Sequence, residues 1–488
     1  MTIEPASIEI ALVSHTNAGK TTLARTLLGR DVGEVRDAPH VTDVAESHTL
    51  LTSAEGDELR LTDTPGFGDS AKLVQRLRVA DNPLGWLLRE VWDRYRDRPF
   101  WCSQQAVRAA RDSAEVVLYL VNAAEDPHDA GYVAYEMQVL RWIGKPVIVL
   151  LNQAGPPGGS DDERRDVERW RTHLAPHGIV EDVLAFDAFA RCWVQERVLF
   201  DAIAAALPSR REPLERLLAA REQANLERFD ASMRVLAEEL AAAARDAEPV
   251  DPEAVSAPQK LLRAMGVGRQ EPDPARERAM ATLAERLDDS IRAATDRLIA
   301  LHGLEGSATQ VVLERMQDNF AMPAQLDEGR AALLGSIVTG ALTGLKADLA
   351  AGGLTFGAGM LVGGVVGGLA GAGLARGVNV LRGAERPAVK WSDEFLDGLV
   401  RSGVLRYLAV AHFGRGRGRY VEGEAPSFWQ GEVEQAMDGH REALHAAWQA
   451  ARSGEPVEDR LADALRAVTA QSLERLYPGR VPASLLAP

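Results

Sequence analysis

The chain has 488 residues, 46% of them hydrophobic, with 55 Lys or Arg against 71 Asp or Glu and a formal net charge of −16. This apolar share is ordinary for a globular protein and too high for a disordered one, and the length suits about three structural units. The acidic balance argues against a general nucleic-acid binder, which needs a basic face to displace counterions. We therefore expect no nucleic-acid partner.

The cysteine content and the N-terminus both favour the cytoplasm. The chain contains two cysteines, Cys102 and Cys192, which excludes a disulfide framework and a cysteine-rich zinc module. The N-terminus lacks a basic segment followed by a long apolar run and a small-residue cleavage site, so it does not resemble a secretory signal. We expect a cytoplasmic protein.

The first 207 residues alternate short β-branched apolar runs with helical stretches. The runs lie at residues 8–13, 59–63, 116–121, 147–151 and 183–186. Such alternation is typical of βαβ units. It predicts an α/β domain over residues 1–207, with a mostly parallel sheet and helices on both faces.

After this domain the strand signals stop, and segments rich in Ala, Leu, Glu and Arg take over. Residues 213–247 and 275–303 have apolar side chains at helical spacing. Between them, residues 248–274 hold five prolines and several acids, which predicts a loop or a flexible insert. We expect an all-α C-terminal part, with a helical region over 208–330 and another over 376–488.

An uncharged, glycine-rich tract separates these two helical regions. Leu349–Ala375 runs for 27 residues without a charge, and glycine recurs there at every fourth position, at Gly359, Gly363, Gly367 and Gly371. On a helix, this spacing places a glycine stripe along one side, where a second helix can approach closely. The pattern predicts a glycine-rich apolar helical hairpin over residues 331–375.

Two interpretations of this hairpin stay open. As a helix, 27 residues span about 40 Å and can cross a bilayer core of about 30 Å, and residues 376–420 carry nine basic against four acidic side chains, which suits anionic lipid head groups. Against this, Gly and Ala are weakly apolar, and Lys346 and Asp348 are costly in mid-membrane. The hairpin is therefore either peripheral or integral at the inner membrane, or it is a buried hairpin that glycine allows to pack tightly.

A phosphate-binding pattern follows the first apolar run. Ser14–Thr22 reads SHTNAGKTT and precedes a helical stretch, which matches GxxxxGK[ST] with Ser14 in place of the first glycine. The chemistry needs backbone N–H groups on phosphate oxygens, an ammonium on the β- and γ-phosphates and a hydroxyl on Mg²⁺, and Gly19, Lys20 and Thr21 supply them. The predicted nucleotide contacts are Ser14, Asn17, Ala18, Gly19, Lys20, Thr21 and Thr22.

A second motif, DTPG at Asp63–Gly66, ends the apolar run at 59–63. A carboxylate at the C-terminal end of a strand can hold the Mg²⁺ water shell, and the N–H of Gly66 can sense the γ-phosphate and order the loop behind it. Thr42, between the two motifs, is expected to complete the Mg²⁺ ligands. The predicted metal ligands are Thr21, Thr42 and Asp63, and the predicted catalytic residues are Lys20, Thr42 and Gly66.

The motifs and their order resemble those of the Era-like, translation-factor-class GTPases over about residues 8–207. The resemblance implies that the protein hydrolyses GTP to GDP and phosphate with Mg²⁺ and acts as a nucleotide-dependent switch. It also implies that Asn17, two places before the glycine of GK, ligates a K⁺ ion that serves as a built-in cation. The alternative, that Asn17 only hydrogen-bonds its own loop, stays open.

Two further segments extend the resemblance to nearly the whole chain. FDAFARCW at 186–193 and YLAVAHFGRGRGRY at 407–420 are similar to segments of bacterial two-part proteins. Those proteins join a GTPase domain to a helical domain of unknown function 3482, which carries no established activity beyond the GTPase assignment. The biological process does not follow from this, and partners stay open: an anionic membrane surface, a membrane protein or a second copy in a homodimer.

The base-reading motif departs from the GTPase pattern. It should read N-K-x-D, whose carboxylate accepts hydrogen bonds from guanine, but residues 152–155 read NQAG. Asn152 can still bind the loops around the base and Gln153 can lie along its face, while Asp187 and Ala188 stand where the fifth GTPase element, [ST]-A, is expected. Losing the carboxylate is expected to relax base specificity by about the free energy of two strong hydrogen bonds, unless another acid, such as Asp161 or Asp187, replaces it.

The residue after DTPG is Phe67, where Ras-like enzymes place a glutamine that orients water. Because phenylalanine cannot hydrogen-bond a nucleophile, we expect slow intrinsic hydrolysis. Two functions stay open. One is a GTPase switch that acts through residues 67–112 on a helical domain at or near a membrane. The other is a membrane-interaction or scaffold protein that binds nucleotide structurally, with little turnover or relaxed base specificity.

Overall fold

The computed structural model describes the greater part of the chain. The described residues are 4–16, 18–29, 46–78, 97–152, 161–186, 192–250, 274–304, 378–380, 388–412 and 428–486. They divide into two compact units, Met1–Glu227 with Ala411–Glu424, and Arg228–Val410 with Ala425–Pro488.

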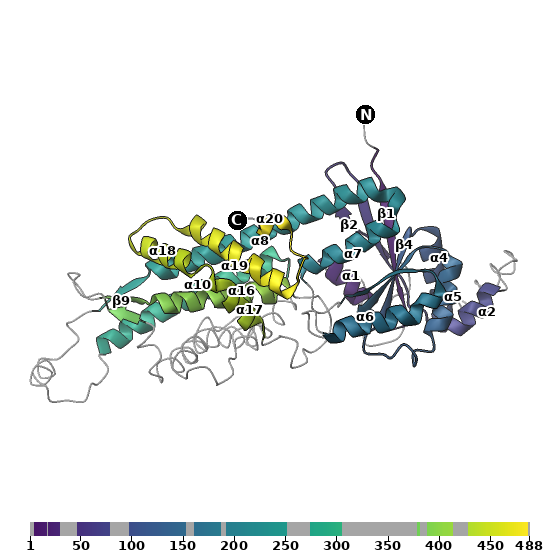
Figure 1. The fold of residues 1–488 in the computed structure, drawn as a ribbon, viewed down its shortest axis with the longest axis horizontal. Helices are drawn as coiled ribbons and strands as arrows, with labels where there is room; N and C mark the ends of the chain where they lie inside the picture. The colour runs from purple at the N-terminus through teal and green to yellow at the C-terminus, as the bar shows by residue number, and fades with distance from the viewer. Residues whose placement is uncertain are drawn as a thin grey trace, which may run out of the picture. The chain divides into compact units, whose positions relative to one another are not determined.

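A six-stranded sheet forms the centre of the first unit (Figure 1). Its order is β2-β3-β1-β4-β5-β6, and only the β2·β3 pair is antiparallel. The strands are β1 (Ser7–Ser14), β2 (Glu46–Thr52), β3 (Glu58–Asp63), β4 (Val116–Asn122), β5 (Val147–Asn152) and β6 (Val180–Ala185). The mostly parallel α/β sheet that the sequence predicts is confirmed.

Helices cover both faces of this sheet. They are α1 (Lys20–Leu28), α2 (Ser70–Arg78), α4 (Arg98–Asp112), α5 (Val133–Ile143), α6 (Asp161–Leu174), α7 (Trp193–Ala206) and the start of α8 (Arg211–Arg245), with short 3₁₀ turns η1 (Ala175–His177) and η2 (Pro208–Arg210). Alternate residues of β1 divide between the two cores, because successive strand side chains point to opposite faces. Ala11 and Val13 pack with α2, α4, α5 and α6, and Ile10 and Leu12 pack with α1, α7 and α8.

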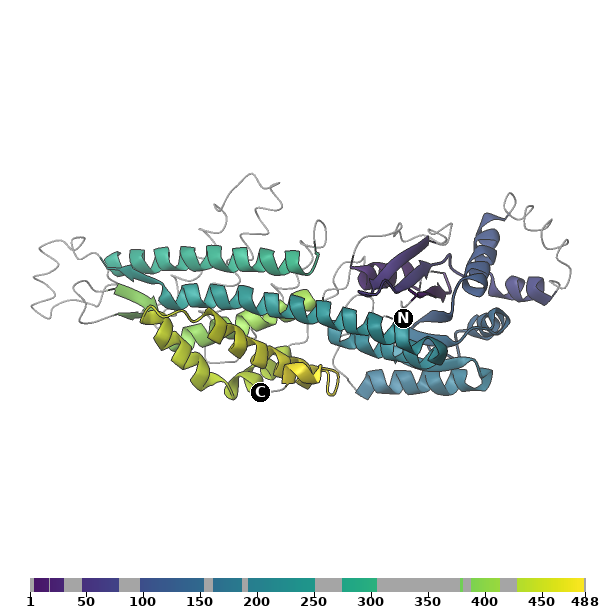
Figure 2. The same ribbon diagram turned by 90° about the horizontal axis from the view of Figure 1, so that it is seen from above.

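The second unit is mainly helical. It contains the rest of α8 together with α10 (Pro274–Leu301), α16 (Asp393–Ala411), α17 (Phe428–Asp438), α18 (Arg441–Arg452), α19 (Glu458–Leu476) and α20 (Ala483–Leu486). Figure 2 shows α10 running alongside this part of α8, where Arg297 forms an ion pair with Glu238. The helical C-terminal prediction is confirmed.

Three short strands add a small sheet that the sequence did not predict. β7 (Ala247–Pro249), β8 (Val378–Val380) and β9 (Ala388–Trp391) pair antiparallel in the order β7-β9-β8. The first residues of the expected loop over 248–274 therefore lie in a strand. Strands of three or four residues are too short to show an alternating pattern, and their pairing depends on residues distant in sequence.

A buried ion pair joins three helices of the second unit. Arg406 of α16 places Nη2 2.5 and 2.8 Å from the two carboxylate oxygens of Glu239 on α8. Its Nη1 donates to the Thr295 hydroxyl and to the Ile291 carbonyl of α10. Both charged side chains are about 1% exposed, so the pair lies within the hydrophobic interior.

No helix among the described residues is both long and apolar enough to cross a bilayer. The hairpin expected over 331–375 lies outside the described residues, as does most of the expected loop over 248–274.

Candidate nucleotide-binding site

The loop between β1 and α1 places Lys20 at the start of a helix. The Lys20 side chain is buried, and its Nζ donates to Oγ of Ser14 at 2.9 Å. Burial lowers the pKa of Lys20, while the carboxylates of Asp63 and Glu136 oppose that shift. The N-terminus of α1 and this ammonium together make the loop a site that favours anions.

Gly19 and Asn152 connect this loop to the end of β5. Gly19 has φ +89°, which L side chains rarely adopt, and a Cβ there would lie 2.6 Å from Nδ2 of Asn152. That same nitrogen donates to the Ala18 carbonyl at 2.9 Å, and Asn152 is fully buried. Only glycine fits between β5 and the loop, so the strand that should read the base is in direct contact with the phosphate loop.

Thr21 and Asp63 lie together beneath the loop. Oγ1 of Thr21 donates to Oδ2 of Asp63 at 2.7 Å. Oδ1 of Asp63 is buried and has no hydrogen-bond partner within the described part of the chain. Burial raises the pKa of Asp63, against the effect of Lys20 and Thr21. A hydroxyl beside a carboxylate with an unpaired oxygen is the hard-oxygen donor set that Mg²⁺ prefers, so these residues fit the ion that the motif implies.

The DTPG loop lies directly on the phosphate loop. The N–H of Phe67 donates to the Ser14 carbonyl at 2.9 Å, and the Thr16 hydroxyl donates to the Phe67 carbonyl at 3.3 Å. A Cβ on Gly66 would lie 3.0 Å from Cα of Thr16 and 3.2 Å from Nζ of Lys20. Glycine at position 66 therefore lets the two loops approach each other at the place where the lysine lies.

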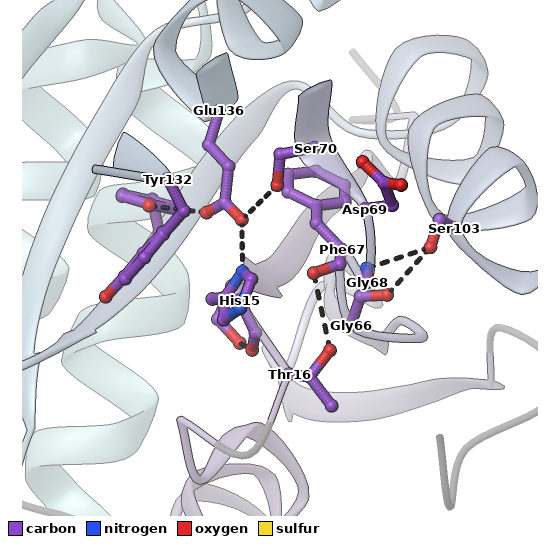
Figure 3. A network of polar contacts seen from close by, with 12 residues as sticks. His15, Thr16, Gly66, Phe67, Gly68, Asp69, Ser70, Ser103, Tyr132 and Glu136 are labelled. Carbon is purple, nitrogen blue, oxygen red and sulfur yellow. Dashed lines mark hydrogen bonds and ion pairs between the residues drawn. The ribbon is translucent and has the colours of Figure 1, made fainter. Parts of the chain in front are cut away.

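Glu136, on α5, is a fully buried carboxylate that accepts several hydrogen bonds (Figure 3). Its Oε1 accepts from the Ser70 hydroxyl at 2.7 Å and lies 2.8 Å from Nδ1 of His15. Its Oε2 accepts from the Tyr119 hydroxyl at 2.6 Å. The His15 imidazole also stacks on the Tyr132 ring, with centroids 4.2 Å apart. One side chain thus joins the phosphate loop, the start of α2 and strand β4.

Ser103, in α4, holds the backbone of the DTPG loop from a second helix. Its hydroxyl donates to the Gly66 carbonyl at 3.2 Å and accepts from the N–H of Gly68 at 3.0 Å. Ser103 is fully buried. The two hydrogen bonds fix the backbone on both sides of Phe67.

Sequence reasoning missed His15, Ser103 and Glu136. Glu136 did carry a signal, because it is a charged residue between Val133 and Met137 on the apolar side of an amphipathic helix. A serine within a helix is common, so Ser103 carried none.

The structure brings several predicted site residues together around the phosphate loop. These are Ser14, Ala18, Gly19, Lys20, Thr21, Asp63, Gly66 and Asn152. Thr22 lies buried in the first turn of α1, where its carbonyl accepts from Thr26. The remaining predicted residues, Asn17, Thr42, Gln153, Asp187 and Ala188, lie outside the described residues.

A mostly parallel sheet, with a buried lysine at the start of its first helix and a hydrogen bond from Thr21 of that helix to Asp63 at the end of β3, defines a P-loop domain of the GTPase type. Residues 9–153 match the family model described as 50S ribosome-binding GTPase. Residues 175–475, more than half of the chain, match the model described as Domain of unknown function (DUF3482). The chain belongs to the DUF3482 family, and its residues 9–153 form a domain that matches the GTPase family model.

Curated GTP-binding proteins are similar to part of the chain. GTPase Der of Myxococcus xanthus (strain DK1622) is 28% identical over 208 residues, which is 42% of this chain and 36% of that protein. The probable GTP-binding protein EngB of Streptococcus thermophilus (strain CNRZ 1066) is 24% identical over 189 residues, 38% of this chain and 81% of that protein. The chain spans about a third of the length of the GTPase Der proteins that it matches.

Among solved structures, a variant of Aquifex aeolicus Era bound to GDP and AlF4⁻ is 18% identical with a TM-score of 0.28, covering 37% of this chain and 51% of that one. Era in complex with MgGDPNP and a segment of 16S ribosomal RNA is also 18% identical with a TM-score of 0.28, covering 38% of this chain and 52% of that one.

Proposed function

We propose that this protein binds GTP with Mg²⁺ and hydrolyses it to GDP and phosphate, as a switch whose nucleotide state acts on the helical C-terminal part. The observation that carries the proposal is the pair of Thr21 and Asp63 near the buried Lys20, in which one carboxylate oxygen of Asp63 has no partner among the described residues. Ion pairing within the protein does not explain a buried carboxylate oxygen without a partner. A bound cation explains it, because a buried charge that nothing neutralises is costly.

Each residue of the proposed nucleotide site has its own role. Lys20 and the N–H groups around Gly19 neutralise and orient the phosphates, and the N–H of Gly66 meets the γ-phosphate. Thr21 and Asp63, with Thr42, would hold Mg²⁺, which when bound neutralises charge on the β- and γ-phosphate oxygens. Asn152 supports the base side of the site, together with Gln153, Asp187 and Ala188.

The test of the site is nucleotide affinity in the Lys20→Ala variant. We expect the dissociation constant for fluorescent GDP to rise at least about a hundredfold, because the variant loses a buried charge-assisted contact to phosphate. Lys145→Ala is the matched control, since Lys145 precedes β5 at the edge of the sheet opposite to Asn152. An affinity for GDP that is equal in the Lys20 variant and the wild type would exclude this phosphate site.

The Mg²⁺ proposal has its own test in Asp63→Asn, which keeps the size of the side chain. The wild type should bind GTP more tightly in MgCl₂ than in EDTA, and the variant should lose most of that difference. A variant that responds to Mg²⁺ as the wild type does would show that Asp63 does not hold the ion.

Base preference is tested by competition. The sequence lacks the aspartate of N-K-x-D, so the proposed guanine preference rests on the match of residues 9–153 to the GTPase family model and on the similarity to GTPase Der. We expect GTP to displace fluorescent GDP at lower concentration than ATP does, and mass spectrometry of the purified protein to identify a guanine nucleotide. Equal displacement by ATP and GTP would mean relaxed base specificity.

Potassium stimulation follows from the proposed K⁺ ligand Asn17. The wild type should release phosphate faster in KCl than in NaCl, and Asn17→Ala should abolish that difference. If turnover in the wild type is the same in both salts, Asn17 only supports its loop.

A second candidate function is nucleotide binding for structure, with little turnover. The burial of Phe67 favours it, because this side chain is fully buried in the core between β1 and α2 and offers the site no group that could orient water. Steady-state phosphate release separates the two functions. Turnover above the rate of the Lys20→Ala variant supports the GTPase, and its absence supports the structural role.

Association with a membrane, peripheral or integral, is part of the proposal through residues 331–375 and the basic residues that follow. Sedimentation of the full chain with vesicles that contain anionic lipid, in GDP and in a GTP analogue, is the test. If the protein stays in the supernatant in both nucleotide states, the switch does not act at a lipid surface.

A further inference from the structure

We propose that Ser103 and Glu136 are positioning residues of the γ-phosphate sensor. From α4 and α5 they hold the segment Gly66–Ser70 against the phosphate loop, in the register in which Gly66 meets the γ-phosphate. This inference rests on the GTPase function proposed above. Neither side chain belongs to the GTPase motifs of the sequence.

Ser103 fixes the segment at its start. The Ser103 hydroxyl has one hydrogen bond to the Gly66 carbonyl and one from the Gly68 N–H, so it spans the peptide units on either side of Phe67. A hydrogen bond from an N–H weakens steeply when its distance or angle changes. Because the N–H of Gly66 belongs to the same short stretch of backbone, Ser103 sets where that donor points.

Glu136 fixes the segment at its end. One carboxylate oxygen of Glu136 binds both the Ser70 hydroxyl and the His15 imidazole, so the first residue of α2 and the phosphate loop share an acceptor (Figure 3). The carboxylate is fully buried, and the Tyr119 hydroxyl binds its other oxygen. Hydrogen bonds to a buried charge are stronger than neutral ones, and losing the charge weakens all of them together.

Ser103 and Glu136 are expected to affect the binding of the γ-phosphate and not that of the α- and β-phosphates. Gly19 and the start of α1 make the cradle for the α- and β-phosphates, whereas the hydrogen bonds of Ser103 and Glu136 that hold the segment go to Gly66, Gly68, Ser70 and His15. Gly66 approaches the phosphate loop beside Nζ of Lys20, where a γ-phosphate is expected. A less firmly held segment Gly66–Ser70 should therefore lower the affinity for GTP more than the affinity for GDP.

The experiment compares nucleotide discrimination in Ser103→Ala and Glu136→Gln. The first variant removes one hydroxyl, and the second keeps the shape of the side chain and removes its charge. Ser113→Ala, at the end of α4, and Glu125→Gln, whose carboxylate also accepts a tyrosine hydroxyl from Tyr132, are the matched controls. Dissociation constants are measured for GDP and for GTPγS on the full chain, and the turnover number is measured for GTP.

We expect both test variants to lose about tenfold in the preference for GTPγS over GDP, and about tenfold in turnover, with GDP affinity within about twofold of the wild type. The controls should match the wild type. An unchanged preference in both test variants would overturn the proposal, and so would a loss of GDP affinity in proportion to that of GTPγS, since this would indicate a merely structural role. Absence of turnover in the wild type would refute the proposed function alone, because the binding preference still decides the role of these residues.

Discussion

Replacing Glu239 by Gln is expected to destabilise the helical unit by about 3–5 kcal/mol. The substitution leaves the guanidinium of Arg406 charged, about 1% exposed and without its carboxylate partner. Water cannot replace that partner at such a buried position, and removing one member of a buried ion pair typically costs this much.

The burial of the pair also predicts how the double replacement will behave. Burial raises the pKa of Glu239 even though Arg406 is bound to it, so the cost of removing this carboxylate from water exceeds the gain from its partner. We therefore expect Glu239→Leu combined with Arg406→Leu to lie within about 1 kcal/mol of the wild type. The Thr295 hydroxyl keeps its hydrogen bond to the Ile291 carbonyl in that variant.

Hydrogen exchange followed by mass spectrometry is the suitable assay, because it reports the opening free energy of peptides from α10 and α16 within the full chain. Glu238→Gln is the matched control: the adjacent Glu238 forms an ion pair with Arg297 in which both side chains are about half exposed, so its loss should cost less than about 0.5 kcal/mol. The reasoning is refuted if Glu239→Gln costs less than about 1 kcal/mol, or if the double replacement costs as much as the single one.

Three further predictions concern the GTPase unit. Hydrogen bonding to Arg216 holds the pKa of the buried Asp57 at about 2, below the ordinary value near 3.8. The ionised carboxylate therefore adds about 2 kcal/mol to the free energy of unfolding above pH 4, and this stabilisation is lost as the pH falls towards 2. Acid unfolding followed by circular dichroism should show a smaller pH dependence over that window in Asp57→Asn, and an unchanged one would exclude the pair as its source. Gly19→Ala should lower GDP affinity at least about tenfold in equilibrium titration, because the new Cβ meets Asn152 and φ is strained, and full affinity would contradict the contact. Gly66→Ala should lower the affinity for GTPγS about tenfold more than the affinity for GDP, and equal losses for both nucleotides would contradict the placement of Gly66 at the third phosphate.

The sequence predicted the central strands well because they are buried on both faces. The expected runs at 116–121 and 147–151 correspond to β4 and β5 within one residue at each end. Such strands are near-continuous apolar runs that need no long-range information. By contrast, β2 at Glu46–Thr52 was not predicted, since it is a partly exposed edge strand with mixed polarity whose pairing with β3 is a tertiary contact.

The candidate site was predictable where a motif fixes the backbone, and not where a side chain comes from elsewhere in the chain. Lys20 and Asp63 belong to local patterns at the ends of two strands that are neighbours in a parallel sheet, so their proximity follows from topology. Glu136 lies 121 residues from His15 along the chain, and no spacing rule connects them. Only the three-dimensional structure shows that α5 contacts the phosphate loop.

The hydrogen bond from Asn152 to the Ala18 carbonyl means that the base end and the phosphate end of the site share one support. Displacing the end of β5 breaks this hydrogen bond to the loop that would hold the phosphates. The backbone of Gly19 is also packed so closely against Asn152 that no side chain fits between the loop and β5. A change in the position of the end of β5 is therefore passed directly to the phosphate loop through this hydrogen bond.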